Sequence, residues 1–292
     1  MENIPRLIHQ IWFQGSHSLP EKYKAFQSTW VYQDGIEYRF WEERTINALF
    51  ASFGGLWEEI YHSFPTMIQK IDFAKYVILY SYGGVYIDMD VFAVKKLTDF
   101  MESNIGVDFL TFQHNTPCIT ITMNKFMGLE GNKIINNAVI FCSSRNERMK
   151  KIINTCCSAQ EDWKKDLLSK QLRCLVTTGP IIFTNCIRTF PDWNKYVREA
   201  EIFEPYTTLE MTKLSKPSDD VSIESNDYMK LMDYLISCKD MQKVYGIHVL
   251  DLNWFKNGKN NWKFRAYRYI QKVKKSIIQT YKDRDGSNSA PM

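Results

Sequence analysis

The chain has 292 residues, of which 45% are hydrophobic and 24% charged, and its formal net charge is +4. These proportions are typical of a folded globular protein and argue against a disordered chain. A net charge this small gives no support for nucleic-acid binding, and no apolar run reaches the length of a membrane span. The totals fit one large domain or two small ones, either soluble or peripheral to a membrane.

The cysteines and the first residues bear on the cellular compartment. The seven cysteines form no C-x-x-C pair and have no histidines at zinc-ligand spacing. We therefore expect free thiols in a reducing environment. Residues 1–13 lack the features of a secretory leader. The expected location is cytoplasmic, with the inner membrane surface as an alternative.

The N-terminal third predicts alternating strands and helices. Residues 6–13 read as a strand, residues 21–33 as a helix with Tyr23, Phe26 and Trp30 on one face, and residues 36–41 as a second strand. Helices are expected over 43–53 and 67–82. The glycines at 83 and 84 stand where the second of these should end, and a short strand follows at 85–87.

This order predicts an α/β fold with a parallel sheet covered on both faces. A further helix is expected near residues 146–157, and the polar stretch 210–227 is expected to be an exposed loop. Ligands of such sheets bind at the carboxyl ends of the strands. The end of the first strand, at Trp12 and Phe13, should therefore flank one crevice with Asp88 and Asp90.

Asp88 and Asp90 follow the apolar strand directly and can reach a common point. Residues two apart on a strand project to the same side, and a turn beginning at Met89 would also keep them close. Two carboxylates at this distance need a cation, and oxygen ligands suit Mg²⁺ or Mn²⁺. A metal-bound diphosphate is the indicated ligand. The alternative is a surface turn with two solvated aspartates, because D-x-D alone is a weak motif.

The wider pattern resembles glycosyltransferase family 32, and its central block also resembles the glucosyltransferase domains of clostridial toxins. The segments that carry the resemblance are, in order, "IPRLIHQIWFQG", "QKIDFAKYVILYSYGGVYIDMDV", "NNAVI", "TGP" and "YGIHVLDLNWF". The resemblance implies a GT-A fold, with a mixed, mostly parallel sheet and helices on both faces. It also implies a metal-dependent nucleotide-sugar donor and transfer with retention at the anomeric carbon.

The resemblance assigns donor contacts to five residues, one of which, Asp88, also binds the metal. Trp12 matches a tryptophan beside the nucleotide base, although it could simply be a core residue. Asp72 matches an aspartate that faces the donor sugar. Lys75 stands where the family has arginine, so a compact ammonium charge replaces a planar guanidinium group. Trp254 matches an indole that donates to a phosphate oxygen.

Four residues are assigned to metal binding and catalysis by the same resemblance. Asp88 would contact the ribose and the metal, and Asp90 would be the principal metal ligand. Asn137 matches an asparagine near the transferred sugar. His248 would be a third metal ligand or a diphosphate partner, with a buried core histidine as the alternative. The expected catalytic residues are thus Asp88, Asp90 and Asn137.

The resulting prediction is a retaining hexosyltransferase that uses Mn²⁺ or Mg²⁺. Its partners would be a UDP- or GDP-linked sugar and a sugar-containing, glycolipid or protein acceptor, with no nucleic acid. One alternative is a metal-dependent phosphohydrolase of nucleotide sugars, which would turn over donor without acceptor. The other is a non-catalytic nucleotide-sugar-binding module, which would tolerate loss of Asp90.

The C-terminal residues are expected to lie outside the transferase domain. We predict a domain over residues 1–258, a basic amphipathic helix over 259–284 and a disordered tail over 285–292. The helix could rest on an anionic membrane as a peripheral contact. It could equally pack its apolar face on the domain.

Overall fold

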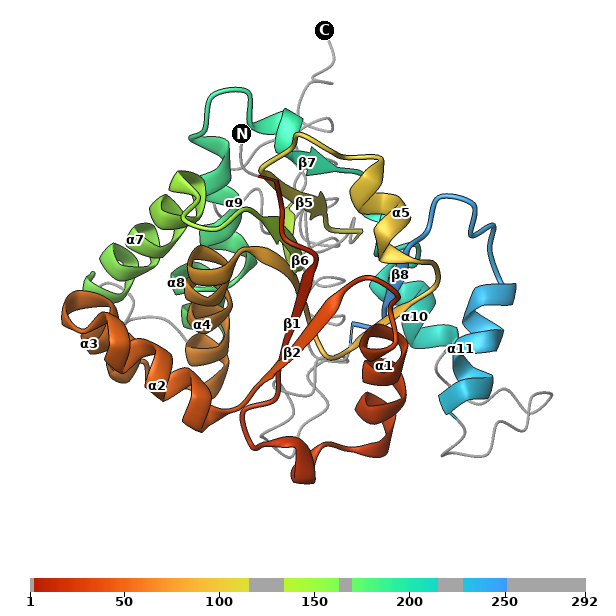
Figure 1. Ribbon diagram of the computed structural model, residues 1–292, viewed down its shortest axis with the longest axis horizontal. Helices are drawn as coiled ribbons and strands as arrows, with labels where there is room; N and C mark the ends of the chain where they lie inside the picture. The colour runs from red at the N-terminus through yellow and green to blue at the C-terminus, as the bar shows by residue number, and fades with distance from the viewer. Residues whose placement is uncertain (1–2, 116–133, 163–169, 215–227, 251–292) are drawn as a thin grey trace, which may run out of the picture.

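A central sheet with helices on both faces organises the molecule (Figure 1). The computed structural model describes residues 3–115, 134–162, 170–214 and 228–250. Several predictions fall outside these described residues. They concern Trp254, the helix over 259–284, the tail over 285–292 and the part of the polar stretch at 215–227.

The main sheet has six strands in the order β2-β1-β3-β6-β5-β7. Three of its five neighbouring pairs are parallel, and β6 runs antiparallel to both of its neighbours. The purely parallel sheet suggested by element order is therefore wrong, and the mixed, mostly parallel sheet implied by the resemblance is confirmed. The strands of the main sheet are β1 (Leu7–Ile11), β2 (Glu37–Trp41), β3 (Gly84–Ile87), β5 (Phe109–Gln113), β6 (Ile135–Cys142) and β7 (Val197–Arg198).

The expected helices that fall within the described residues are present close to their predicted limits. None of the described helices is both long and apolar enough to cross a bilayer. The helices are α1 (Glu21–Val31), α2 (Glu43–Phe53), α3 (Gly55–Ser63), α4 (Met67–Tyr82), α5 (Leu97–Glu102), α7 (Glu147–Glu161), α8 (Lys170–Thr177), α9 (Pro180–Arg188), α10 (Thr208–Leu214) and α11 (Tyr228–Ser237).

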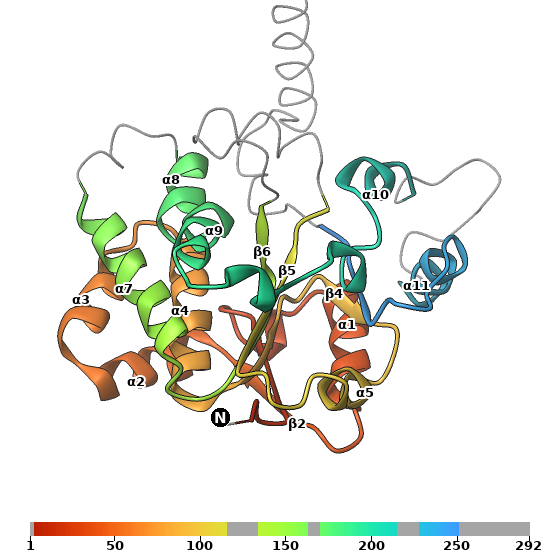
Figure 2. The ribbon, with the colours of Figure 1, turned by 90° about the horizontal axis from the view of Figure 1, so that it is seen from above.

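Helices cover the two faces of the sheet in separate groups (Figure 2). On one face lie α2, α3, α4, α7, α8 and α9, and on the other lie α1, α5, α10 and α11. Strand β3 is buried on both sides. Tyr86 packs with the first group, whereas Val85 and Ile87 pack on the opposite face. This alternation is the period of two expected of a strand.

A second, two-stranded sheet brings distant parts of the chain together. Strand β4 (Val91–Ala93) pairs antiparallel with β8 (Gly246–His248), and Val91 lies opposite His248. The backbone N–H of Val249 also donates to the carbonyl of Asp90, at 2.9 Å. The residues after β3 are thereby fixed to a segment about 150 positions later in the chain.

The double glycine after α4 is required by close backbone contacts. Gly83 and Gly84 have φ angles of 66° and 97°, as the sequence predicts for the end of this helix. A Cβ atom at Gly84 would lie 2.3 Å from the carbonyl oxygen of Leu7 in β1. Only glycine lets the chain leave α4 and enter the sheet directly beside β1, so this pair fixes where β3 begins.

The start of the stretch predicted to be an exposed loop is helical. Residues 210–214 belong to α10, and Met211 is buried. The cause is a capping box that the sequence prediction missed. The backbone N–H of Thr207 donates to Glu210, and the N–H of Glu210 donates to the Thr207 hydroxyl.

A fully buried histidine in β1 predicts a pH-dependent stability. His9 Nε2 lies 2.8 Å from the carbonyl oxygen of Gly83, and its Nδ1 accepts from the indole N–H of Trp41 at 3.1 Å. If Nδ1 were protonated, its N–H would point at the indole N–H of Trp41, and the two donors would repel each other. Burial, with a contribution from Arg39, lowers the pKa of His9 to about 4.

We expect His9 to destabilise the fold as the pH falls from about 6.5 to about 4, because the unfolded chain then binds a proton that the folded chain excludes. The largest loss is about 3 kcal/mol, at 1.36 kcal/mol per pKa unit. This loss is measured by urea unfolding of the wild type and of His9→Gln at pH 7.5 and at pH 5. The wild type should exceed His9→Gln in free energy of unfolding by less at pH 5 than at pH 7.5. A difference independent of pH would contradict the prediction.

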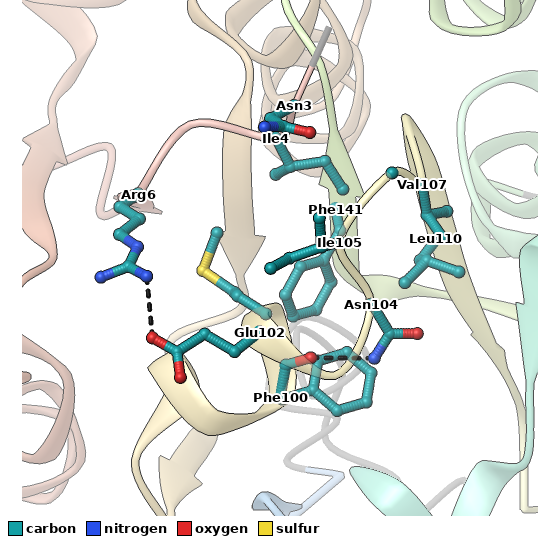
Figure 3. Close-up of a pocket in the computed structure, with 12 residues that line it drawn as sticks. Asn3, Ile4, Arg6, Phe100, Glu102, Asn104, Ile105, Val107, Leu110 and Phe141 are labelled. Atoms are coloured by element: carbon teal, nitrogen blue, oxygen red, sulfur yellow. Dashed lines mark hydrogen bonds and ion pairs between the residues drawn. The ribbon is translucent and has the colours of Figure 1, made fainter. Parts of the chain in front are cut away.

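Figure 3 shows a small apolar pocket lined by residues just before β1 and by Phe141. Phe141 lies beside the start of β3, whereas Asp88 follows the end of that strand. The volume of the pocket is about 160 Å³, and Ile4, Phe100, Ile105 and Phe141 are among the side chains that line it. An Arg6–Glu102 ion pair of 2.9 Å stands at its rim. The pocket and the pair of aspartates, Asp88 and Asp90, are therefore separate features.

Candidate functional site

Asp88 and Asp90 lie in a tight turn at the carboxyl end of β3. The N–H of Asp88 still bonds to Ala138 in β6, at 2.8 Å, and the N–H of Val91 donates to the Asp88 carbonyl at 3.1 Å. Met89 between them is buried. The turn that begins at Met89, one of the two geometries considered from the sequence, is the one present, and it directs both carboxylates to one side.

Three side chains form a group that could hold a metal ion. Asp88, Asp90 and His248 each offer one ligand atom, and these atoms lie within 4.8 Å of one another. His248 Nε2 is 3.3 Å from Asp90 Oδ1. The histidine reaches this position because β8 pairs with β4 immediately after the turn. Two carboxylates and an imidazole nitrogen are a suitable donor set for a divalent cation.

One oxygen of Asp88 is already engaged by neighbouring side chains. The Tyr86 hydroxyl donates to Asp88 Oδ1 at 2.8 Å, and Lys75 Nζ lies 3.6 Å from the same oxygen. Burial raises the pKa of Asp88, Lys75 opposes that shift, and the Asp90 carboxylate adds to it. A carboxyl group in this environment gains from a nearby cation, since a cation favours its ionised form.

Lys75 is buried, and protein groups surround its ammonium. Its Nζ lies 2.8 Å from Asp72 Oδ1 and donates to the carbonyl of Asn137 at 3.1 Å, and the side chain is only 2% exposed. Burial alone would lower the pKa of Lys75, but the carboxylates of Asp72 and Asp88 outweigh it and raise the pKa. Lys75 is therefore an internal counter-ion to two carboxylates. Its predicted contact with the donor stays a prediction.

Asp72 joins three further polar groups on the α4 face of the sheet. The Asn137 side chain donates to Asp72 Oδ1 at 3.2 Å and to the Tyr76 hydroxyl at 2.9 Å. Thr178, from the "TGP" segment, donates to Asp72 Oδ2 at 3.4 Å. Burial raises the pKa of Asp72, and Lys75 opposes it. The structure thus brings Asp72, Lys75 and Asn137 together beside Asp88.

A buried glutamate that the sequence reasoning missed lies behind His248. Glu204 Oε1 is 2.6 Å from His248 Nδ1, and the side chain is 1% exposed. Its other oxygen is 2.5 Å from His114 Nδ1 and accepts from the Asn115 N–H at 2.8 Å. The available sequence signal was a lone glutamate inside the otherwise apolar run "IFEPY".

Glu204 and His248 stabilise each other's charged forms, and His114 beside Glu204 also stabilises that of the glutamate. Burial alone would raise the pKa of Glu204, but His114 and His248 outweigh it and lower the pKa far below the ordinary value. Burial would lower the pKa of His248, but Asp90 and Glu204 raise it well above the ordinary value. Glu204 is therefore an ionised, hydrogen-bonded group directly beside a candidate metal ligand.

Trp12 lies at the end of β1, as predicted. Its indole N–H donates to the Ser18 hydroxyl at 3.1 Å, and its ring is tilted against that of Tyr23 at 5.2 Å. The ring is partly buried against the cluster that includes Met89. Stacking on a nucleotide base stays a prediction, and Trp254 lies outside the described residues.

Comparison with known proteins identifies the segment that carries this turn. Residues 20–108 match the family model described as the glycosyltransferase sugar-binding region containing the DXD motif. The chain is therefore similar to DXD glycosyltransferases over this segment, which is less than a third of its length. The family resemblance read from the sequence is thereby confirmed, and Asp88-Met89-Asp90 is the DXD motif of the match.

Two similar proteins illustrate the extent of the relationship. The chain is 38% identical over 112 residues to an uncharacterized glycosyltransferase of Acanthamoeba polyphaga mimivirus, covering 38% of this chain and 44% of the relative. It is 35% identical over 101 residues to inositol phosphoceramide mannosyltransferase 1 of Schizosaccharomyces pombe, covering 33% of this chain and 31% of the relative. The similarity thus spans less than half the length of either relative.

Among solved structures, the chain is similar to the ligand-free glycosyltransferase domain from the YGT toxin. The TM-score is 0.46 at 12% identity, covering 75% of this chain and 84% of the toxin domain. The mixed sheet of this chain and the DXD motif at the carboxyl end of β3 agree with the GT-A fold expected from the sequence.

Proposed function

We propose that the protein is a metal-dependent glycosyltransferase that moves a hexose from a nucleotide-diphosphate sugar to an acceptor hydroxyl. One observation carries the proposal. In a chain with a DXD sugar-binding region, the two motif aspartates and His248 offer ligand atoms within 4.8 Å of one another. Such a group, at the carboxyl end of β3, suits a cation shared with a ligand diphosphate.

The donor set favours Mn²⁺, with Mg²⁺ as the second choice. The two carboxylates suit either ion, but the imidazole nitrogen is a better ligand for Mn²⁺ than for the harder Mg²⁺. When bound, the ion would neutralise charge on the leaving diphosphate. Asp88, Asp90 and His248 would hold it, and Tyr86 and Lys75 would keep Asp88 correctly oriented from behind.

The cluster around Asp72 would lie on the sugar side of this site. Asp72 and Asn137 are held by mutual hydrogen bonds, and Lys75 links them to Asp88. Rigid polar groups of this kind suit sugar hydroxyls, which both donate and accept. We assign Asp72 and Asn137 to the donor sugar. We assign Lys75 to the support of Asp72 and Asp88, because its ammonium is enclosed by protein groups.

The proposal also covers the identity of the donor sugar and the class of acceptor. Mannose is the first donor sugar to test, since one relative is an inositol phosphoceramide mannosyltransferase. Retention at the anomeric carbon, a glycan, glycolipid or protein acceptor, and a cytoplasmic location stay predictions from the sequence.

The proposal predicts that nucleotide sugars stabilise the protein only when Mn²⁺ is present. A donor at a hundred times its Kd should stabilise the fold by about 2.7 kcal/mol. Thermal unfolding with GDP-mannose, UDP-glucose and UDP-galactose, each with Mn²⁺ or with EDTA, provides the measurement. No shift with any donor in Mn²⁺ would contradict the proposal.

Donor turnover separates transfer from hydrolysis. Release of the nucleoside diphosphate is followed with and without an acceptor mixture of methyl hexosides and a total lipid extract. A transferase should release it faster with acceptor, with the sugar recovered on that acceptor. Equal release without acceptor, with free sugar as the product, would identify a phosphohydrolase.

A further inference from the structure

Glu204 makes four side-chain contacts in the core, and all of them come from hydrogen-bond donors. Oε1 faces His248 Nδ1 at 2.6 Å and also accepts from the Asn136 amide. Oε2 faces His114 Nδ1 at 2.5 Å and accepts from the Asn115 N–H at 2.8 Å. A carboxylate with this many donors is held in one orientation.

The backbone around Glu204 is tied to the strand that carries His248. The N–H of His248 donates to the Phe203 carbonyl at 2.9 Å, and the N–H of Glu204 donates to the Ala200 carbonyl at 2.6 Å. Carboxylate and imidazole are thus fixed relative to each other by both main chain and side chain. The imidazole cannot rotate without losing its contact with Glu204.

This contact decides which nitrogen of His248 is available to a cation. A carboxylate oxygen only accepts, so the nitrogen 2.6 Å from Glu204 Oε1 must carry a proton and cannot bind a cation. The other nitrogen, Nε2, faces Asp90 Oδ1 at 3.3 Å, on the side of the DXD turn. Nε2 therefore faces the position that Asp88 and Asp90 also face, and it can offer its lone pair there once a cation replaces the proton on it.

We propose that Glu204 is a positioning residue for the metal site: it holds His248 as the Nδ1–H tautomer and aims Nε2 at the cation shared with Asp88 and Asp90. The inference rests on the proposed metal-dependent function and extends it to a residue outside the DXD region. Carboxylates behind metal-binding histidines fix ring orientation and raise ligand basicity, and their loss typically costs tenfold to hundredfold in metal affinity.

The test is Mn²⁺ affinity, measured on the full chain without any sugar donor. Glu204→Gln keeps the side-chain volume but removes the charge and one acceptor. We expect its Kd for Mn²⁺, from calorimetry or from electron paramagnetic resonance of free Mn²⁺, to rise at least tenfold. Glu201→Gln is the matched control, because Glu201 is an exposed carboxylate three residues earlier. Its Kd should equal that of the wild type.

A double-mutant comparison separates positioning from a general structural role. If Glu204 acts through His248, Glu204→Gln should change the Kd less than twofold in a His248→Gln background. An equal loss in both backgrounds, or an unchanged Kd in folded Glu204→Gln, would overturn the inference. A wild type that binds no Mn²⁺ would instead overturn the proposed metal site, so the two failures are distinguishable.

A measurement on the wild type covers the case in which Glu204→Gln does not fold. Protein with ¹⁵N-labelled histidines is loaded with ¹¹³Cd²⁺ as a diamagnetic substitute for Mn²⁺, and His248 is assigned by comparison with His248→Gln. The inference predicts a proton on Nδ1 and coupling of the cadmium to Nε2. Coupling to Nδ1, or no coupling to His248, would overturn it.

Discussion

Replacing Asp90 with asparagine is expected to lower kcat/KM for sugar transfer by about a thousandfold or more, with the fold intact. A thousandfold loss corresponds to about 4 kcal/mol of transition-state stabilisation. The physical reason is that asparagine removes the anionic ligand nearest His248 Nε2, where the distance is 3.3 Å. A weakly held cation cannot stabilise charge on the leaving diphosphate.

The fold should survive because the Asp90 side chain is not part of the core. It is 17% exposed, and the backbone carbonyl that accepts from Val249 stays in place in the variant. Far-UV circular dichroism and thermal unfolding check the fold, and release of nucleoside diphosphate in Mn²⁺ with acceptor measures activity. Asp34→Asn is the control, because Asp34 forms a surface ion pair with Lys96, and it should keep full activity.

A folded Asp90→Asn variant that keeps more than a tenth of the activity would contradict the metal role of the motif. Asp88 is a less suitable test residue. Its Oδ1 accepts from Tyr86 and lies 3.6 Å from Lys75, so its replacement would also disturb the buried lysine. Of the two motif aspartates, Asp90 is therefore the better residue for separating loss of a metal ligand from disturbance of the buried lysine.

The sequence predicts those parts of the site that depend on local chemistry. The spacing of Asp88 and Asp90 places both carboxylates on one side, whether in a strand or in a turn. The glycines at 83 and 84 predict the end of α4 and the start of β3, and their positive φ angles agree. Because α4 and β3 are adjacent in the chain, the neighbourhood of Asp72, Lys75 and Asp88 follows from local structure.

The remaining contacts depend on pairings between distant segments. His248 reaches Asp90 only because β8 pairs with β4, and no periodicity in the sequence predicts that register. Glu204 lies in a segment without regular structure, so neither a helical nor a strand period identifies it. The burial of Lys75 was missed for a related reason. Its enclosure depends on Asn137 in β6, a strand more than 60 residues away.

The largest expected effect on stability is that of Lys75→Met, which should destabilise the fold by about 3–5 kcal/mol. Methionine fills a similar volume but leaves Asp72 and Asp88 without their shared cation, and unpaired buried charges cost this much. The Lys75 side chain is 2% exposed and that of Asp72 10%, so water cannot substitute for the lost ammonium. The melting temperature should fall by roughly 10 °C.

Urea unfolding of a double-mutant cycle tests the cause of this loss. Asp72→Asn should be less harmful in the Lys75→Met background than in the wild type, because the amide removes a carboxylate that has no counter-ion. Lys75→Arg keeps the charge but adds volume to a closed site, and its cost should be about 1–3 kcal/mol. If Lys75→Met instead lost donor affinity with less than about 1 kcal/mol of stability, the lysine would contact the donor, as its place in the family pattern suggests. The two roles therefore differ in which quantity changes, the free energy of unfolding or the affinity for the nucleotide sugar.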